Sequence, residues 1–340
     1  NFFFFFFFLQ KTFGATSQAA WQLDSFGQSL TLSWAAAKFG MKHMVITNID
    51  NTKRLQREKE ENLQFIWKFP DETSIITHIL PNYCPYSTLD CEPNCETSLF
   101  NVDLYKKETK SFVKGFKFDT FVLDGCNFDW TDASKRFKYT DNVIKQHSSS
   151  KYSLWSDYVK AFEAQTKIQD LQSFTEDFFV SSEESGDAWS GYFTTKPRLK
   201  LKNRILGKVM RSLRSFAFAG LADRRRPDEN SLASMAEDTA VLLSHKGVSG
   251  TSKLKVDEDY LILYTNLLFK AASFVDSSLS SNSITFYLDD ITSTLSVPEW
   301  GSDPLLLRFY NPAPYTIESV FEVRFPASRA SVEKVSMLSN

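Results

Sequence analysis

Short apolar strand segments alternate with helical segments through residues 10–175, and this order restricts the fold more than any other feature of the chain. Apolar spacing predicts a helix over 30–39, which Gly40 follows as a C-terminal cap, and a charged helix over 52–68. The predicted strands are 44–46, 75–80 and 120–123. Repeated strand, loop and helix predict an α/β domain with a largely parallel sheet, whose site lies in the loops after the carboxyl ends of the strands.

The second half of the chain has a different pattern. Apolar residues recur at helical spacing over 199–220, 232–243 and 260–274, which predicts three helices in a small bundle. From about residue 276 the chain becomes serine-rich, and residues 321–325 then alternate as in a half-buried strand. We expect too few strands there for a complete sandwich.

Composition excludes several classes of protein. The 39 basic and 41 acidic residues nearly cancel, which argues against a nucleic-acid binder that works by bulk charge. No apolar run approaches the ~18 residues that a membrane span needs, so we expect none. Seven of the 32 phenylalanines form one run at 2–8. That run is compatible with the apolar part of a signal peptide or a buried strand, but we favour a homopolymer artefact at a damaged start and exclude 1–8 from the functional reasoning.

Cys91 and Cys95 flank a short proline-containing turn. The pair is compatible with a tight disulfide, with two free thiols, or with a metal site to which only His78 is close. A disulfide would indicate a secretory or lysosomal lumen. The chain has no Asn-x-Ser/Thr sequon, which is unusual for a lumenal glycoprotein of this length.

One dense block, residues 21–29, contains a carboxylate beside an aromatic residue and a glycine, ahead of a predicted helix. Taken alone, its Asp24 is typical of a helix cap or a solvated loop residue. The whole block, Trp-Gln-Leu-Asp-Ser-Phe-Gly-Gln-Ser, resembles the Trp-x-Ile-Asp-Pro-Phe-Gly-His-Ser block of glycoside hydrolase family 38, the zinc-dependent α-mannosidases. Further blocks resemble that family in the same order, at 63–68, 77–83, 189–197, 244–251 and 306–312.

The resemblance implies the domain plan of a chain truncated at both ends. We expect an incomplete parallel β/α-barrel catalytic domain over 9–180, a helical middle domain over 186–275, and the start of a C-terminal β-sandwich over 280–340. It also implies a mannose-containing glycan as the partner and the secretory pathway or lysosome as the location, although no signal peptide is visible.

Retaining glycosidases use one carboxylate as nucleophile and a second carboxyl group as acid and base. By resemblance, Asp24 falls at the nucleophile position, which also binds zinc, and Phe26 and Tyr83 fall at sugar-binding positions. His245 falls at a zinc-ligand position. Its alternative interpretation is a partly buried histidine at a helix C-terminus.

Three departures from the family pattern predict impaired hydrolysis. The acid/base position holds Asn127, whose amide does not act as a carboxylic acid. Ser244 and Lys246 replace a histidine and an aspartate beside His245. The family's other two zinc ligands lie in a His-x-Asp motif ahead of Asp24, and no histidine precedes Asp24 here, so we expect an incomplete zinc site. A catalytically dead glycan-binding paralogue and a pseudogene fragment stay open as alternatives.

Overall fold

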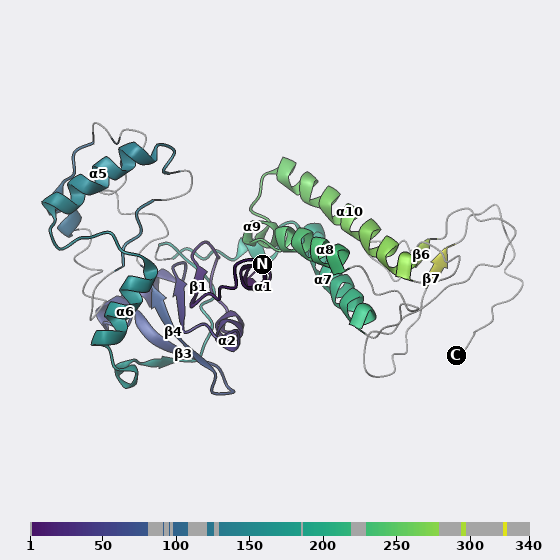
Figure 1. The fold of residues 1–340 in the computed structure, drawn as a ribbon, viewed down its shortest axis with the longest axis horizontal. Helices are drawn as coiled ribbons and strands as arrows, with labels where there is room; N and C mark the ends of the chain where they lie inside the picture. Colours follow the sequence, from purple (N-terminus) through teal and green to yellow (C-terminus); the bar gives the residue numbers. More distant parts are fainter. Residues whose placement is uncertain are drawn as a thin grey trace, which may run out of the picture. The chain divides into compact units, whose positions relative to one another are not determined.

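The computed structural model describes residues 2–80, 91, 95, 98–107, 121–125, 129–184, 186–218, 229–278, 294–296 and 322–324. The chain divides into two compact units (Figure 1). One unit is 9–191, and the other combines 1–8 with 192–340. Among the described residues, no helix has both the length and the apolar character that crossing a bilayer requires.

A five-stranded sheet forms the centre of unit 9–191 (Figure 1). Its strands are β1 (Ala19–Gln22), β2 (His43–Ile46), β3 (Gln64–Lys68), β4 (Ser74–Ile79) and β5 (Ser173–Phe174), in the order β1-β2-β4-β3-β5. The strands β1, β2 and β4 run parallel, while β3 is antiparallel to β4. The sheet is therefore mixed, with a parallel part whose carboxyl ends share one edge.

The same unit contains the helices α2 (Leu30–Lys38), α3 (Asn51–Lys59), α5 (Ala133–Gln146) and α6 (Trp155–Gln165). Helix α2 packs on β3 and β4, whereas α5 lies away from the sheet (Figure 1). The short turns η1 (Ile168–Asp170) and η2 (Gly191–Phe193) complete the named elements of this region. Ser29 caps α2 by accepting a hydrogen bond from the Thr31 amide, and Gly40 follows the helix with a φ of 83°. The predicted helix and its glycine terminator are thus confirmed.

The single helix predicted over 52–68 is wrong. Helix α3 ends at Lys59, Glu61 takes a left-handed φ of 51°, and β3 begins at Gln64. The side chains of Phe65 and Trp67 are buried at 0% and 1% exposure. An apolar run of this length fits a buried strand as well as a helix, and pairing with β4 and β5 selects the strand.

Two other expectations for the first half of the chain are also changed. The described part of the predicted strand 120–123, residues 121–123, is not in a strand. The phenylalanine run belongs to helix α1 (Phe2–Phe13), so the buried-strand interpretation of that run is wrong.

The second unit contains three long helices, α7 (Pro197–Phe218), α8 (Glu229–Leu242) and α10 (Leu254–Ser278), and the short helix α9 (His245–Ser249). The long helices lie where the apolar spacing predicted them. They share one apolar core, formed by Leu206, Met210, Leu213, Met235, Leu242, Tyr264, Leu267, Ala271 and Phe274. Strand β6 (Thr294–Ser296) pairs in parallel with β7 (Glu322–Arg324). Strand β7 lies within the predicted strand 321–325. The rest of the expected sandwich lies outside the described residues.

Candidate active site

Asp24 lies in the loop that leaves the carboxyl end of β1, and the loop is held on both sides of it. Before Asp24, the hydroxyl of Thr47 donates a 2.5 Å hydrogen bond to the Leu23 carbonyl. After it, the buried side chain of Gln28 reaches back to the Gln22 carbonyl at 3.4 Å. Thr47 directly follows β2, so the contact joins the carboxyl ends of two parallel strands. Ser29 is the cap of α2, and the cap interpretation of Asp24 is therefore wrong.

A distant segment, 177–179, closes the same loop. The amides and carbonyls of Gln28 and Phe178 exchange two backbone hydrogen bonds of 2.9 and 2.8 Å, and Asp177 accepts from the Leu30 amide at 2.5 Å. Gly27 has a φ of 97°, and a Cβ there would lie 2.8 Å from the Phe178 carbonyl oxygen. The site loop therefore requires glycine at 27 for both its conformation and its space. The sequence pattern gave no signal for this closing segment.

Phe26 packs against Trp189, with ring centroids 5.6 Å apart and a tilt of 57°. The Trp189 amide in turn donates to the Ser181 carbonyl at 2.9 Å. The two rings come from separate sequence blocks, 21–29 and 189–197. The sequence predicted Phe26 as a sugar-binding residue but did not single out Trp189. The only sequence feature that pointed to Trp189 was its place in the family-like block 189–197.

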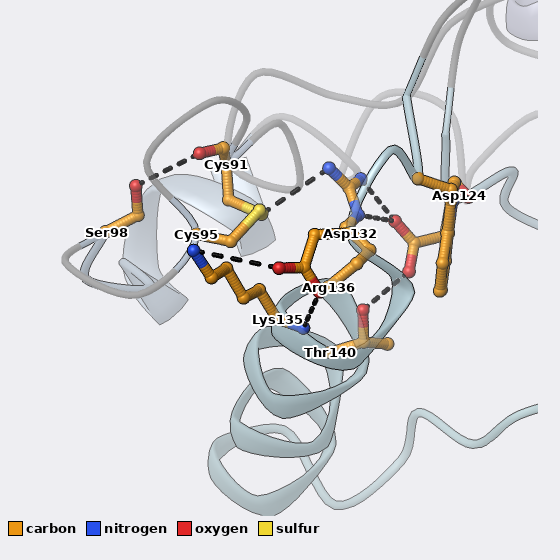
Figure 2. The surroundings of a disulfide bond; sticks show 9 residues. Cys91, Cys95, Ser98, Asp124, Asp132, Lys135, Arg136 and Thr140 are labelled. Atoms are coloured by element: carbon orange, nitrogen blue, oxygen red, sulfur yellow. Dashed lines mark hydrogen bonds and ion pairs between the residues drawn. A yellow bond between two sulfur atoms is a disulfide. The ribbon is translucent and has the colours of Figure 1, made fainter.

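Asn127 and Tyr83 lie outside the described residues, but the segment before Asn127 is described. The carboxylate of Asp124 accepts from Arg136 Nε at 3.1 Å, from Arg136 Nη2 at 2.5 Å and from the Thr140 hydroxyl at 2.7 Å (Figure 2). The Asp124 carbonyl accepts from the Trp130 indole at 2.8 Å. Asp124 is thus engaged by a fully buried guanidinium, and both of its carboxylate oxygens already accept hydrogen bonds.

The disulfide Cys91–Cys95 adjoins the same arginine (Figure 2). Its Cα atoms are 4.5 Å apart, within the range that a disulfide spans. Arg136 Nη1 lies 3.5 Å from the Cys91 sulfur, and Ser98 donates to the Cys91 carbonyl at 3.5 Å. The free-thiol and metal interpretations of this cysteine pair are therefore wrong.

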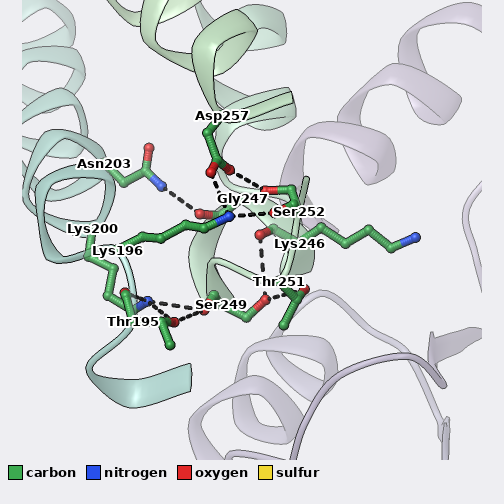
Figure 3. A network of polar contacts seen from close by, with 10 residues as sticks. All are labelled: Thr195, Lys196, Lys200, Asn203, Lys246, Gly247, Ser249, Thr251, Ser252 and Asp257. Carbon is green, nitrogen blue, oxygen red and sulfur yellow. Dashed lines mark hydrogen bonds and ion pairs between the residues drawn. The ribbon is translucent and has the colours of Figure 1, made fainter. Parts of the chain in front are cut away.

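His245 is the first residue of α9 and is exposed to solvent. Ser244 precedes it as the helix cap and accepts a 3.2 Å hydrogen bond from the Gly247 amide. The alternative interpretation, a partly buried histidine at a helix C-terminus, is wrong because His245 stands at the amino end of its helix. Lys246 is also exposed, and its side chain extends away from the neighbouring polar contacts (Figure 3).

The turn after His245 is fixed to the start of α7 (Figure 3). The Ser249 carbonyl accepts from the Thr195 hydroxyl at 2.9 Å and from the Lys200 ammonium at 3.0 Å. Lys196 forms a 2.5 Å ion pair with Asp257, which is 11% exposed. The Thr195–Ser249 bond joins the sequence blocks 189–197 and 244–251, and the Lys196–Asp257 pair joins the first block to α10.

The predicted site residues are thus distributed over two units. Asp24 and Phe26 lie in unit 9–191 and His245 lies in the other unit. Within the ranges described above, no group of three or more histidine, cysteine, aspartate or glutamate side chains is arranged to hold a metal ion. The described residues therefore do not by themselves provide the donor set of a zinc site.

Comparison with known proteins identifies the chain's relatives. The family model for the glycosyl hydrolases family 38 N-terminal domain matches residues 2–184, and the model for the alpha mannosidase middle domain matches 187–281. Alpha-mannosidase F of Dictyostelium discoideum is 25% identical over 344 residues, covering 93% of this chain and 34% of that protein. Lysosomal alpha-mannosidase of Felis catus is 26% identical over 286 residues, covering 74% and 28%.

The chain thus spans about a third of the length of the curated relatives it matches. Among solved structures, an alpha-mannosidase from Enterococcus faecalis superposes with a TM-score of 0.55 over 79% of this chain and 30% of that one, at 14% identity. This likeness shows the shared fold. The first family model alone matches more than half of the chain and confirms the resemblance inferred from the sequence blocks. The chain therefore belongs to glycosyl hydrolase family 38, the family of the α-mannosidases.

Proposed function

We propose that unit 9–191 carries the nucleophile and part of the sugar site of an α-mannosidase-type retaining hydrolase, and that hydrolysis by this chain is impaired. The observation that carries the proposal is the loop of Asp24, which is held at the carboxyl end of β1 by Thr47, Gln28 and Phe178. A nucleophilic carboxylate must be held in place before the substrate arrives, because each misplacement raises the barrier to attack. The bonds on either side of Asp24 support this requirement for the backbone that carries it.

Impairment follows from Asn127 at the acid/base position. An amide supplies no acidic proton to the leaving oxygen, and general acid catalysis contributes about 10²–10⁴-fold in rate. Asp124 offers no compensation because Arg136 and Thr140 engage its carboxylate. The proposal therefore assigns the loss of acid catalysis to position 127, in addition to the weakened zinc site.

Asp24 and His245 are the residues of this chain that we would assign to a zinc site of this family. Carboxylate oxygen and imidazole nitrogen are both suitable zinc ligands, and bound zinc would polarise the sugar hydroxyls. The exposed Lys246 beside His245 adds positive charge, which would weaken the binding of a cation. Since the described residues lack a complete donor set, we derive no step through zinc.

The domain plan belongs to the same proposal. We assign 9–180 to a partial barrel-type catalytic domain, 186–275 to the helical middle domain and 280–340 to the start of a sandwich. The spans of the two family models support the first two assignments. The proposed ligand is a mannose-containing glycan. The disulfide Cys91–Cys95 supports a location in the secretory pathway or lysosome, since disulfides persist in oxidising compartments.

The hydrolytic proposal is tested with an aryl α-mannoside in the presence of added zinc. We expect turnover near background for the unmodified chain and a gain of about 10²–10⁴-fold for Asn127→Asp, since a carboxylic acid is restored. The double variant Asn127→Asp, Asp24→Asn should lose that gain. Equal turnover with and without Asp24 would contradict its assignment as nucleophile.

Glycan binding without hydrolysis is a second candidate, favoured by the packing of Phe26 on Trp189. Aromatic rings provide apolar area and a defined face for a sugar, and neither property depends on the acid at 127. Calorimetric titration with a mannose oligosaccharide tests this candidate. We expect Phe26→Ala to weaken the binding while Phe137→Ala, which replaces an exposed phenylalanine on α5, does not.

A further inference from the structure

Two of the four histidines of the chain lie buried side by side between sheet and helix. His43 on β2 is 2% exposed and His78 on β4 is fully buried. The Nδ1 atom of His43 lies 3.0 Å from the Nε2 atom of His78, and Phe162 of α6 packs against both rings. Neither histidine belongs to the proposed sugar or zinc site.

Hydrogen bonds extend from this pair in both directions. His43 Nε2 lies 3.2 Å from a carboxylate oxygen of Glu163, which is half exposed. His78 Nδ1 lies 3.3 Å from the hydroxyl of Tyr158, and that hydroxyl accepts a 2.6 Å hydrogen bond from Gln64 Nε2. These five residues, which we call the histidine chain, join strands β2, β3 and β4 to helix α6.

When both rings are neutral, the Glu163 end fixes the direction of every bond in the histidine chain. The Glu163 carboxylate only accepts, so a neutral His43 carries its proton on Nε2 and accepts at Nδ1. His78 therefore donates from Nε2 and accepts at Nδ1 from the Tyr158 hydroxyl. The amide nitrogen of Gln64 only donates, which agrees with the oxygen of Tyr158 as its acceptor. With both rings neutral, all four bonds are satisfied at once and no charge is buried.

One added proton breaks this arrangement. A proton on His43 Nδ1 would place two N–H donors face to face across 3.0 Å. A reversed bond from His43 to His78 would require His78 to donate from Nδ1 towards the Tyr158 hydroxyl, against the direction of the neutral arrangement. Either outcome also places a positive charge on rings that are 2% and 0% exposed, and a buried charge destabilises the folded state, which weakens the attachment of α6 to the sheet.

The surroundings also favour neutral rings. Burial lowers the pKa of His43, the hydrogen bond and charge of Glu163 partly oppose that shift, and Lys42 adds to it. Burial lowers the pKa of His78 well below its usual value, and His43 lowers it further. The rings also pack against the aromatic side chains of Trp155, Tyr158 and Phe162.

We propose that the histidine chain is an acid-sensitive lock, which holds α6 on the sheet while both rings are neutral and releases it when the pair takes up a proton. The device would make unit 9–191 stable near neutral pH and progressively weaker in an acidic compartment. Within the proposed range of locations, it favours the near-neutral part of the secretory pathway over the lysosome.

The sign follows from proton linkage. Because the pKa of each ring is lower in the folded than in the unfolded chain, the unfolded chain binds more protons once the pH falls below about 6.5. Stability is therefore complete above pH 6.5 and is lost as the pH falls towards the folded pKa values. Each histidine that stays neutral lowers the folding equilibrium constant by up to about tenfold per pH unit in this window.

The first experiment measures denaturant unfolding of the whole chain at pH 7.5 and pH 5.5. We expect the folding equilibrium constant of the unmodified chain to fall by about tenfold to a hundredfold more than that of the double variant His43→Gln, His78→Gln. The matched control is His147→Gln, which replaces a histidine in the same unit outside the histidine chain and should keep the full pH effect. An equal pH effect in the unmodified chain and the double variant would overturn the proposal.

A second measurement remains decisive if the double variant does not fold. Nitrogen-15 labelling of the histidines gives only four side chains to assign in the unmodified protein. We expect two rings protonated on Nε2 alone and still neutral at pH 6.5, where an ordinary histidine is half charged. Hydrogen exchange in α6 should accelerate at pH 5.5 more than in α5, after correction for intrinsic rates. Charged rings at pH 6.5, or unchanged protection of α6, would overturn the lock.

Discussion

The rings of Phe26 and Trp189 lie 5.6 Å apart, although they come from opposite ends of unit 9–191. Their contact joins the loop of Asp24 to the segment that leads out of the unit. The position of the proposed sugar site is therefore set by packing between distant segments as well as by the strand that Asp24 follows.

We predict an energetic coupling between these two rings. Aromatic pairs contribute about 0.5–1.5 kcal/mol beyond the area that they bury, so a double-mutant cycle of Phe26→Leu and Trp189→Leu should give a coupling in that range. Denaturant unfolding measures it. A cycle between Phe26 and Trp34, whose ring packs on Phe69 instead, is the control and should give additive effects. Additivity of Phe26 with Trp189 would show that the rings act independently.

Gly27→Ala tests the space around the site loop. The new Cβ would lie 2.8 Å from the Phe178 carbonyl and 2.5 Å from a ring carbon of Phe179, at a φ of 97° that already disfavours alanine. Gly40→Ala is a matched control, since Gly40 also has a positive φ, of 83°, but has nothing within 4 Å of the added Cβ. We expect Gly27→Ala to cost at least about 1 kcal/mol more in unfolding free energy. Equal costs would mean that the loop moves without penalty.

Arg136→Met should be among the most destabilising substitutions in unit 9–191. It would leave the Asp124 carboxylate without its buried guanidinium, and breaking a buried ion pair costs about 3–5 kcal/mol. The control is the adjacent Lys135→Met, which removes a solvent-exposed ion pair with Asp132 and should cost about 0–1 kcal/mol. Thermal unfolding of the two variants separates these values. A small effect of Arg136→Met would mean that solvent or other side chains replace the lost partner.

Local patterns predicted the parts of the fold that local interactions determine. The three long helices of the second unit followed from apolar spacing, and α2 followed from its apolar face and the glycine after it. The strand β3 was missed because five apolar-rich residues fit either a strand or a helix. Its neighbours in the sheet decide between them, and they lie elsewhere in the chain.

The candidate site also combines features that local sequence predicts with features that depend on distant residues. The sequence block predicted Asp24 and Phe26 as neighbours in one loop. It did not predict that Phe178 closes that loop, that Trp189 covers Phe26, or that Arg136 holds Asp124. The first two contacts join residues from opposite ends of unit 9–191, and the third joins residues 12 positions apart across a loop, so none leaves a periodic trace.

The central claim, that Asp24 is placed as a glycosidase nucleophile and that the chain lacks its acid at position 127, is tested most directly by covalent trapping. A 2-deoxy-2-fluoro-mannosyl fluoride carries a leaving group that departs without a general acid. Attack by the Asp24 carboxylate forms the bond to C1 as the C1–F bond breaks and fluoride leaves, and the 2-fluorine slows hydrolysis of the product. Peptide mass spectrometry after incubation with zinc should find one fluoromannosyl group on the peptide with Asp24, and none in Asp24→Asn. Labelling of a different carboxylate, or no label at a concentration that saturates binding, would contradict the account.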